Sequence, residues 1–493
     1  MDSMFDVLVI GGGVVGCNMA HELSKYDLKL ALVEKESDVC GGASKANSGV
    51  VHSGIYSQPG SLKAGLCVKG NTLFPTFVEE LGVDFKRIGK LAVARNEVEI
   101  RELEKLKEVG DKNRVWDLEF LDEEEVKKLE PNINAQKGLW VPSAGIVSPY
   151  HLTIALAENA WENKVKIFLD SEVADISPKE GYFGVKTKNL NLKSRWIINS
   201  AGLYCDKIAE MVGITKHRVY PCRGEYLILD KSYSHLINHL IYPPPENGSG
   251  GLGVHLTPTI EGNILIGPSA KYIEGKEDTR TTKEGMEKLL LGATSLLKNL
   301  PKDAYIQSYA GIRCKLIPQT CEFSGDFVIE EDEGVKGFIN LMGIESPGLS
   351  ASPAITKKVV DIIKANEDLK IKEDFKTRKG RMRFHKLDLK EKVNLIDSNP
   401  RHGHLICRCE NVTEREVIDA IENPLEVRTL SGIKYRCRAT MGRCQGGFCR
   451  ARIVKIMEEQ FGEDVKDITQ RGPGSFLFVG RTKDLRKHDS KEC

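Results

Sequence analysis

The sequence predicts a mixed α/β and α+β protein in which a doubly wound domain precedes a small C-terminal module. Three observations predict this architecture. The chain opens with a buried-strand pattern, a glycine turn and a helical pattern. Strand-like and helical patterns then alternate to about residue 365, and four cysteines cluster beyond residue 403.

Size and composition are those of a soluble protein of two or three domains. The chain has 493 residues with a formal net charge of +1, so no strong field marks a nucleic-acid or membrane partner. No apolar run approaches the roughly 18 residues of a membrane span, and the N-terminus lacks a secretory signal pattern. Thirteen cysteines are an odd number for a disulfide framework, so we expect a cytoplasmic protein.

The first elements form the opening βαβ unit. Phe5–Ile10 is an unbroken apolar run and predicts a buried strand. Val15–Leu23 predicts a helix, and Leu28–Val33 predicts a second buried strand.

The turn between the first strand and the helix carries a dinucleotide-binding pattern. Gly11, Gly13 and Gly16 satisfy G-x-G-x-x-G, in which small residues allow the tight turn, the approach of a pyrophosphate and close helix–strand packing. Glu34 ends the second strand, where a carboxylate can accept hydrogen bonds from a ribose. These features predict a Rossmann-like fold.

Two later segments favour FAD over NAD as the dinucleotide. Residues 197–206 read as a strand ending in Ala201-Gly202, and residues 337–356 as a strand, a glycine turn and a helix. A dinucleotide contacted from the start, middle and end of a domain indicates a permanently held flavin. Alternatively, both segments are ordinary strand–turn–helix joints.

Residues 4–365 resemble the D-amino-acid-oxidase-like family of FAD oxidoreductases. Segments 45–71, 219–229 and 251–270 resemble its L-2-hydroxyglutarate oxidase branch in particular. The resemblance implies a Rossmann-like FAD-binding domain interleaved with an antiparallel-sheet substrate domain. The cofactor contacts that it implies are Gly11, Gly13, Gly16, Glu34, Ser48, Val173, Ala201, Gly202 and Gly348. Val173 is alternatively a core residue.

Three residues are candidates for the substrate pocket. His52, in SGVVHSG, and His255, in GVHLTP, are each candidates for the base that takes a hydroxyl proton, with the other orienting flavin or substrate. Arg313, in YAGIRCK, is the candidate that binds the substrate anion. Second-rank candidates are Arg223, Tyr242 and Lys315. The glycines of 247–253 predict either a mobile lid or a plain hairpin.

A polar, basic segment separates the large domain from the cysteine module. Residues 357–368 predict a last amphipathic helix of the large domain. We interpret 366–402 as a connecting arm packed on the surface through Phe375, Met382 and Phe384, with a free tether as the alternative. The module itself covers 403–460, and a tail over 461–493 contains one strand-like piece, GPGSFLFVG.

The module contains two closely spaced cysteine pairs, Cys407-x-Cys409 and Cys444-x4-Cys449. Four thiolates form a soft-ligand site for zinc or an iron–sulfur cluster, and this spacing departs from the C-x-x-C knuckles of structural zinc. The arrangement resembles the bacterioferritin-associated-ferredoxin-like domain, which implies a [2Fe–2S] cluster. Zinc, a vestigial site and a purely structural staple are the alternatives. Cys437 falls outside the matched positions.

The segment MGRCQGGFC (441–449) resembles the form of this module that is fused to the catalytic subunit of anaerobic glycerol-3-phosphate dehydrogenases, which implies the catalytic subunit of an FAD-dependent glycerol-3-phosphate dehydrogenase. Its expected course is hydride transfer from C2 to flavin, proton loss to a histidine, and electron flow through the cluster to additional redox subunits in a hetero-oligomeric complex. An L-2-hydroxyglutarate or related 2-hydroxy-acid dehydrogenase is the alternative, and a non-catalytic electron-transfer subunit is a second. The segment 316–329 lacks the further arginine that glycerol-3-phosphate dehydrogenases usually place there, which weakens the assignment of this substrate.

Overall fold

The computed structural model describes residues 4–245, 253–301, 303–318, 325–480 and 482. It divides into two compact units, one of residues 1–35 and 39–379 and one of residues 36–38 and 380–493. The loop 247–253, predicted as a lid or hairpin, lies outside the described residues except for Gly253.

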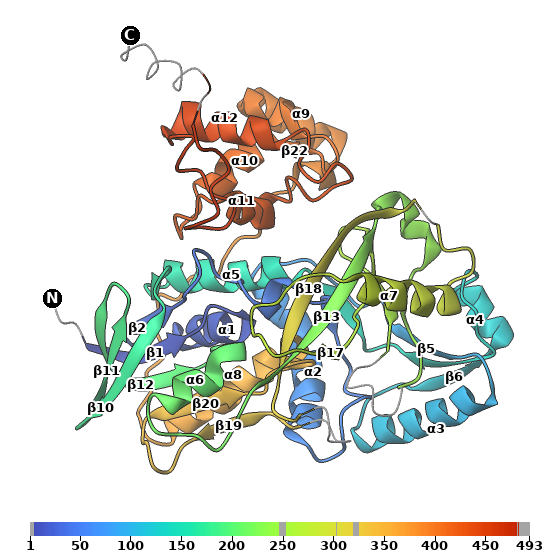
Figure 1. The fold of residues 1–493 in the computed structure, drawn as a ribbon, viewed down its shortest axis with the longest axis horizontal. Helices are drawn as coiled ribbons and strands as arrows, with labels where there is room; N and C mark the ends of the chain where they lie inside the picture. Colours follow the sequence, from blue (N-terminus) through green and yellow to red (C-terminus); the bar gives the residue numbers. More distant parts are fainter. Residues whose placement is uncertain (1–3, 246–252, 302, 319–324, 481, 483–493) are drawn as a thin grey trace, which may run out of the picture. The chain divides into compact units, whose positions relative to one another are not determined.

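A mixed sheet forms the dinucleotide-binding half of the first unit (Figure 1). Its parallel centre runs in the order β9, β2, β1, β12 and β20, with antiparallel β11 and β10 beside β12 and β19 beside β20. The strands are β1 (Met4–Ile10), β2 (Leu30–Val33), β9 (Lys166–Phe168), β10 (Val173–Lys179), β11 (Tyr182–Thr187), β12 (Asn191–Asn199), β19 (Val328–Glu331) and β20 (Phe338–Met342). The predicted first strand, helix and second strand are therefore confirmed to within two residues.

Helices bury this sheet and bring distant segments together. Helix α1 (Val14–Leu23) packs against β1 and β2 and also contacts α5 (Pro149–Glu162) and α8 (Gly348–Lys364). Helix α8 in turn packs on α2 (Leu62–Glu80). Because strands β1, β2, β12 and β20 run parallel, the turns after them all lie at one edge of the sheet.

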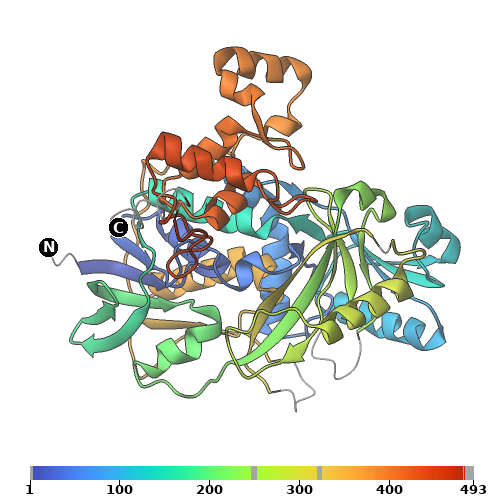
Figure 2. The ribbon, with the colours of Figure 1, turned by 45° about the horizontal axis from the view of Figure 1, so that its top comes forward.

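A second, nine-stranded sheet is mostly antiparallel and forms the other half of the first unit. Its strands are β5 (Lys90–Ala94), β6 (Glu119–Asp122), β7 (Lys137–Val141), β13 (Tyr220–Leu229), β14 (Leu240–Tyr242), β15 (His255–Pro258), β16 (Ile264–Gly267), β17 (Lys271–Tyr272) and β18 (Tyr305–Lys315). Helix α7 (Lys283–Leu296) lies against β13, β15 and β16 (Figure 2). Strands of the two sheets alternate along the chain, since β5–β7 lie between β2 and β9, and β13–β18 lie between β12 and β19.

Smaller elements complete the first unit. A three-stranded sheet joins β3 (Val50–Val51), β8 (Gly145–Val147) and β4 (Phe85–Lys86). The remaining helices are η1 (Ala43–Lys45), α3 (Glu97–Lys112), α4 (Glu123–Leu129), η2 (Gly202–Tyr204), α6 (Cys205–Glu210) and η3 (Lys231–Leu236).

The second unit is small and largely helical. Its elements are η4 (Phe384–Lys386), α9 (Leu389–Ser398), η5 (Pro400–Gly403), β21 (Leu405–Cys407), β22 (Val412–Thr413), α10 (Glu414–Ile421), α11 (Leu430–Cys437) and α12 (Arg450–Phe461). Capping boxes at Asp388 and Thr413 begin two of these helices. In the tail, GPGSFLFVG makes only an isolated bridge between Thr469 and Phe476, because its glycines favour turns over a ladder.

The boundary between the units falls inside the predicted arm. Phe375 packs edge-on against His21 of the first unit, with ring centroids 5.8 Å apart. Phe384 instead stacks on His402 of the second unit, with centroids 6.2 Å apart. The segment thus contributes an anchor to each unit, and its second half contains α9. Among the described residues, no helix is both long and apolar enough to cross a membrane.

Candidate functional site

The glycine turn after β1 has no room for side chains. Gly11 has φ +104°, and a Cβ there would lie 2.6 Å from the carbonyl oxygen of Ser200, directly after β12. A Cβ on Gly16 would overlap the Gly11 carbonyl oxygen. Gly13 faces the Ser44 hydroxyl, 3.2 Å from where its Cβ would be. The turn is therefore held tightly between two strands, as a pyrophosphate cradle requires.

Glu34 lies beside this turn. It follows β2, and its Oε2 accepts a hydrogen bond of 2.6 Å from the Gly12 amide. Val173 begins β10 and belongs to the hydrophobic core of this sheet. Ala201 and Gly202 follow β12, and Gly202 has φ +56°.

Two helices begin at this edge without a side-chain cap. The N-cap residues of α1 and α8 are Gly13 and Pro347, and neither has a side chain that caps its helix, although the Ser44 hydroxyl accepts from the Val14 amide at 2.8 Å. By contrast, Ser61, Asn96 and Thr282 cap their helices through side chains. Open helix N-termini attract anions, so the residues present fit a dinucleotide diphosphate.

The loop after β3 carries His52 and is held by two helices. The His52 amide donates to the Ser350 hydroxyl of α8 at 2.7 Å, and its carbonyl accepts from Asn71 of α2 at 3.0 Å. The imidazole is half-buried, with Nε2 3.2 Å from the Ser346 hydroxyl. Burial, with a neighbouring Lys90, lowers the His52 pKa well below its ordinary value. The ring is therefore uncharged at neutral pH.

His255 lies deeper, at the start of β15. Its ring stacks on Tyr242 with centroids 3.9 Å apart, and Tyr242 also faces the His52 ring edge-on at 6.5 Å. Nδ1 is 3.1 Å from the Gly253 carbonyl, which can only accept, so Nδ1 carries the proton. Burial lowers the His255 pKa to about 3. The structure thus brings both predicted histidines to one aromatic cluster.

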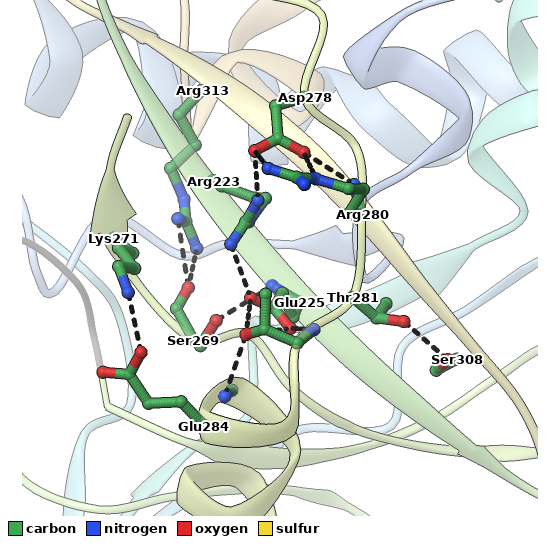
Figure 3. Close-up of polar contacts among 12 residues, drawn as sticks. Arg223, Glu225, Ser269, Lys271, Asp278, Arg280, Thr281, Glu284, Ser308 and Arg313 are labelled. Carbon is green, nitrogen blue, oxygen red and sulfur yellow. Dashed lines mark hydrogen bonds and ion pairs between the residues drawn. The ribbon is translucent and has the colours of Figure 1, made fainter. Parts of the chain in front are cut away.

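Arg313 and Arg223 lie on neighbouring strands with different partners (Figure 3). Both terminal nitrogens of Arg313 donate to the Ser269 carbonyl at 3.2 Å. Arg223 is buried between Glu225, at 3.3 Å, and Asp278, at 2.7 Å (Figure 3). Arg223 is therefore committed to a structural ion-pair network, whereas no described carboxylate forms an ion pair with Arg313.

Lys315 is also committed, to the loop that precedes α8. Its Nζ lies 3.2 Å from Glu345, and Lys63 of α2 lies 3.0 Å from the same oxygen. Glu345 directly precedes Ser346, the hydroxyl partner of His52. These buried ion pairs hold the His52 loop, α2 and α8 in register. Ser48 lies on the other side of β3, before Val50, and the Tyr309 hydroxyl of β18 donates to the neighbouring Asn47 carbonyl at 3.2 Å.

Sequence reasoning missed Lys90, the first residue of β5. This lysine has no exposed surface, and its Nζ lies 3.5 Å from His52 Nδ1. Its sequence signal was a single cation at the start of the buried run KLAVA. Tyr56 was missed as well and stacks on Tyr242 with centroids 5.9 Å apart.

The aromatic cluster around Tyr242 contains buried polar atoms that have no hydrogen-bond partner among the described residues. The hydroxyls of Tyr56 and Tyr242 and Nε2 of His255 are buried and make no hydrogen bond to any described residue. Buried polar atoms without partners are costly, and a polar ligand would satisfy them.

The four predicted cysteines of the second unit lie as two thiol pairs. Cys407 ends β21 and accepts a hydrogen bond from Cys449, which lowers the Cys407 pKa to about 6 and raises that of Cys449. Cys409 and Cys444 are hydrogen-bonded to each other.

The loop around these pairs is tight. A Cβ on Gly442 would overlap Cβ of Cys409, so the loop that carries Cys444 lies directly against Cys409. Among the described residues, no three His, Cys, Asp or Glu side chains lie close enough together to bind a single metal ion. Two thiol pairs are the arrangement that a binuclear cluster uses, since each iron takes two protein ligands.

Comparisons with known proteins identify both units. The model of the FAD dependent oxidoreductase family matches residues 6–362, and that of the BFD-like [2Fe-2S] binding domain matches residues 405–459. The chain is 42% identical to a glycerol 3-phosphate dehydrogenase of Caloramator mitchellensis, over 97% of this chain and 99% of the relative. It is 31% identical to the human mitochondrial L-2-hydroxyglutarate dehydrogenase, over 74% of this chain and 90% of that one.

Solved structures agree with this family. A dithionite-reduced L-alpha-glycerophosphate oxidase of Mycoplasma pneumoniae with FAD bound superposes with a TM-score of 0.71 at 34% identity, covering 77% of this chain and 99% of that one. The predictions of FAD and of a [2Fe–2S] cluster are confirmed. The chain belongs to the FAD-dependent oxidoreductase family, and it is an oxidoreductase that carries a BFD-like [2Fe–2S] domain at its C-terminal end.

Proposed function

We propose that this enzyme is the catalytic subunit of a glycerol-3-phosphate dehydrogenase and oxidises glycerol 3-phosphate to dihydroxyacetone phosphate. The observation that carries the proposal is the similarity to the Caloramator enzyme over 97% of this chain, which extends through the flavin unit and the cysteine unit alike. The cation Arg313, which forms no ion pair with a described carboxylate and lies near His255, supports an anionic substrate.

In this proposal each residue of the site has one role. Bound FAD supplies the acceptor for the hydride that leaves the substrate carbon. His52 takes the hydroxyl proton at Nε2, because its ring is half-buried and uncharged and its backbone is held from both sides. His255, fully packed against Tyr242, orients the substrate, and Arg313 binds its phosphate. The predicted contacts Gly11, Gly13, Gly16, Glu34, Ser48, Val173, Ala201, Gly202 and Gly348 hold the cofactor.

An L-2-hydroxy-acid substrate is the second candidate, favoured by the 31% identity to the human L-2-hydroxyglutarate dehydrogenase. The test is anaerobic bleaching of the flavin with glycerol 3-phosphate and, separately, with L-2-hydroxyglutarate. We expect rapid bleaching by glycerol 3-phosphate. Bleaching by the hydroxy acid alone would overturn the proposed substrate, and no bleaching by either would favour a purely electron-transferring subunit.

The cluster domain supports an electron path to a further redox subunit in a hetero-oligomeric complex. In this proposal Cys407, Cys409, Cys444 and Cys449 bind the cluster, and Cys444 is exposed on the unit's surface. Beside it the half-exposed ring of Phe448 lies between the guanidinium groups of Arg408 and Arg452, 4.6 and 4.5 Å from its centroid. An exposed aromatic side chain among cations suits a docking surface for an acidic redox protein. A cytoplasmic location belongs to the same proposal, because the thiolates must stay reduced. Copurification from the native source tests for the partner.

A further inference from the structure

Lys90 is a fully buried lysine, and burial makes its charged ammonium form costly. Its side chain is fully buried at the start of β5, and among the described residues no carboxylate forms an ion pair with it. Burial lowers its pKa to about 7. The other buried lysines near the site, Lys63 and Lys315, share Glu345. Packing of the strand does not require a cation at position 90, so the amine calls for a chemical explanation.

The groups that face Lys90 come from four elements. Nζ lies 3.5 Å from Nδ1 of His52, 4.0 Å from the centroid of the Tyr242 ring and 4.7 Å from that of Tyr56. Cys67 of α2 and His255 of β15 are its further titratable neighbours, and burial raises the Cys67 pKa to about 12. These neighbours are all neutral at pH 7, so Lys90 and His52 together can hold one positive charge but not two.

We propose that Lys90 and His52 form a proton-sharing pair, in which the uncharged Lys90 amine accepts the Nδ1 hydrogen of His52, so that Nε2 carries no proton and can take the substrate's hydroxyl proton in place of its contact with Ser346. The inference rests on the proposed role of His52 as the base. Lys90 is a positioning residue, because it acts on the substrate through His52.

The protons and electrons balance in this scheme. The substrate O–H bond breaks and its proton goes to Nε2 of His52, while the C–H bond breaks and its electron pair goes as a hydride to the bound flavin, so that a carbonyl group forms. The Nδ1 proton of the transient imidazolium passes to Nζ of Lys90. The resulting ammonium faces the rings of Tyr242 and Tyr56, where cation–π attraction stabilises it. His255 has no such acceptor, since its Nδ1 faces a carbonyl group.

The two substitutions Lys90→Arg and Lys90→Met separate this role from packing or anion binding. A guanidinium stays charged and donates to Nδ1, which places the ring proton on Nε2 and blocks the base. We expect flavin reduction to slow by at least about 100-fold at every pH in K90R. In K90M the ring keeps both tautomers, so we expect a loss of about tenfold. Lys86→Arg, at an exposed lysine of β4 in the three-stranded sheet, is the matched control and should leave the rate unchanged.

The pH profile provides a second readout. In the wild type, protonated Lys90 blocks the relay, so the rate of flavin reduction should rise as the pH rises through about 7. K90M should lose this ionisation. A Lys90 that binds the substrate anion predicts the reverse order, with K90R close to wild type and K90M worse. K90R within about twofold of wild type would overturn the proposal.

A substrate-free measurement separates this inference from the proposed function. Nitrogen-15 NMR of histidine-labelled resting holoenzyme, with His52 assigned by its absence in His52→Gln, should show the proton on Nδ1 in wild type and on Nε2 in K90R. A wild-type proton on Nε2 would refute the pair. If the tautomers are as expected but His52→Gln reduces its flavin at the wild-type rate, the pair stands and the role of His52 as base fails.

Discussion

The two cofactor sites of this chain are built in opposite ways. The four cysteines lie between residues 407 and 449 and are brought together by two short loops of one small unit. The proposed flavin and substrate site draws on residues from Gly11 to Gly348, which come from two sheets and three helices. A local site is readable from spacing, whereas a dispersed site depends on which side chains the fold brings into contact.

The largest expected effect tests the local site. Cys444→Ser should abolish the electron paramagnetic resonance signal of the reduced cluster, because one iron loses a thiolate ligand. The flavin absorbance should stay intact, because the cysteines belong to the second unit and the proposed flavin-binding residues to the first. Cys437→Ser is the matched control, since the Cys437 thiol already donates to the Ile433 carbonyl at 3.2 Å inside α11. A signal that survives in C444S would refute the ligand assignment.

The next effect tests the dispersed site at its proposed base. His52→Gln should slow anaerobic flavin reduction by about 10²–10⁴-fold, the usual contribution of a general base. His255→Gln should cost less in rate and more in substrate affinity, because His255 is held by Gly253 and Tyr242. Stopped-flow reduction over a series of substrate concentrations measures both the rate and the affinity. If flavin reduction is slower in H255Q than in H52Q, His255 is the base and His52 orients the substrate.

A third effect tests whether burial makes the ion pairs of Arg223, on β13, structural. Arg223→Met should lower the free energy of unfolding by about 3–5 kcal/mol, because it leaves buried Glu225 without its cation. Arg280 binds the same Asp278 but is 81% exposed, so Arg280→Met should leave the free energy of unfolding nearly unchanged. Denaturant unfolding of the two variants measures the loss in the free energy of unfolding. Equal losses would show that burial does not determine how much an arginine of this network contributes to stability.

The smallest effect concerns the glycine turn. Gly16→Ala places a methyl group against the Gly11 carbonyl, and about 1–3 kcal/mol of overpacking should weaken flavin binding roughly tenfold. Gly42→Ala is the control, because no atom lies within 4 Å of its added Cβ. Flavin content after dialysis reports the result, and similar retention in both variants would mean that the turn tolerates a side chain.

Sequence reasoning succeeded where chemistry is encoded in neighbouring positions. The opening strand, glycine turn and helix, the FAD assignment and the cysteine spacing all rest on local patterns or on family resemblance, and the fold and both cofactors are confirmed. Local patterns also located the cysteine pairs, because each pair lies within a few residues of one short element. Cys407 ends β21, with Cys409 in the turn that follows, and Cys449 directly precedes α12.

The relations between distant side chains were not predictable. Arg223, Arg313 and Lys315 look alike in a strand pattern, yet burial commits the first to Glu225 and Asp278 and the third to Glu345. In the sequence, Lys90 is a single cation at the start of an apolar run, with no indication of its partner. Only the folded structure, through β5, places it beside His52. Spacing along the chain specifies backbone conformation and local ligands, whereas the charge that a buried group carries depends on partners that only folding supplies.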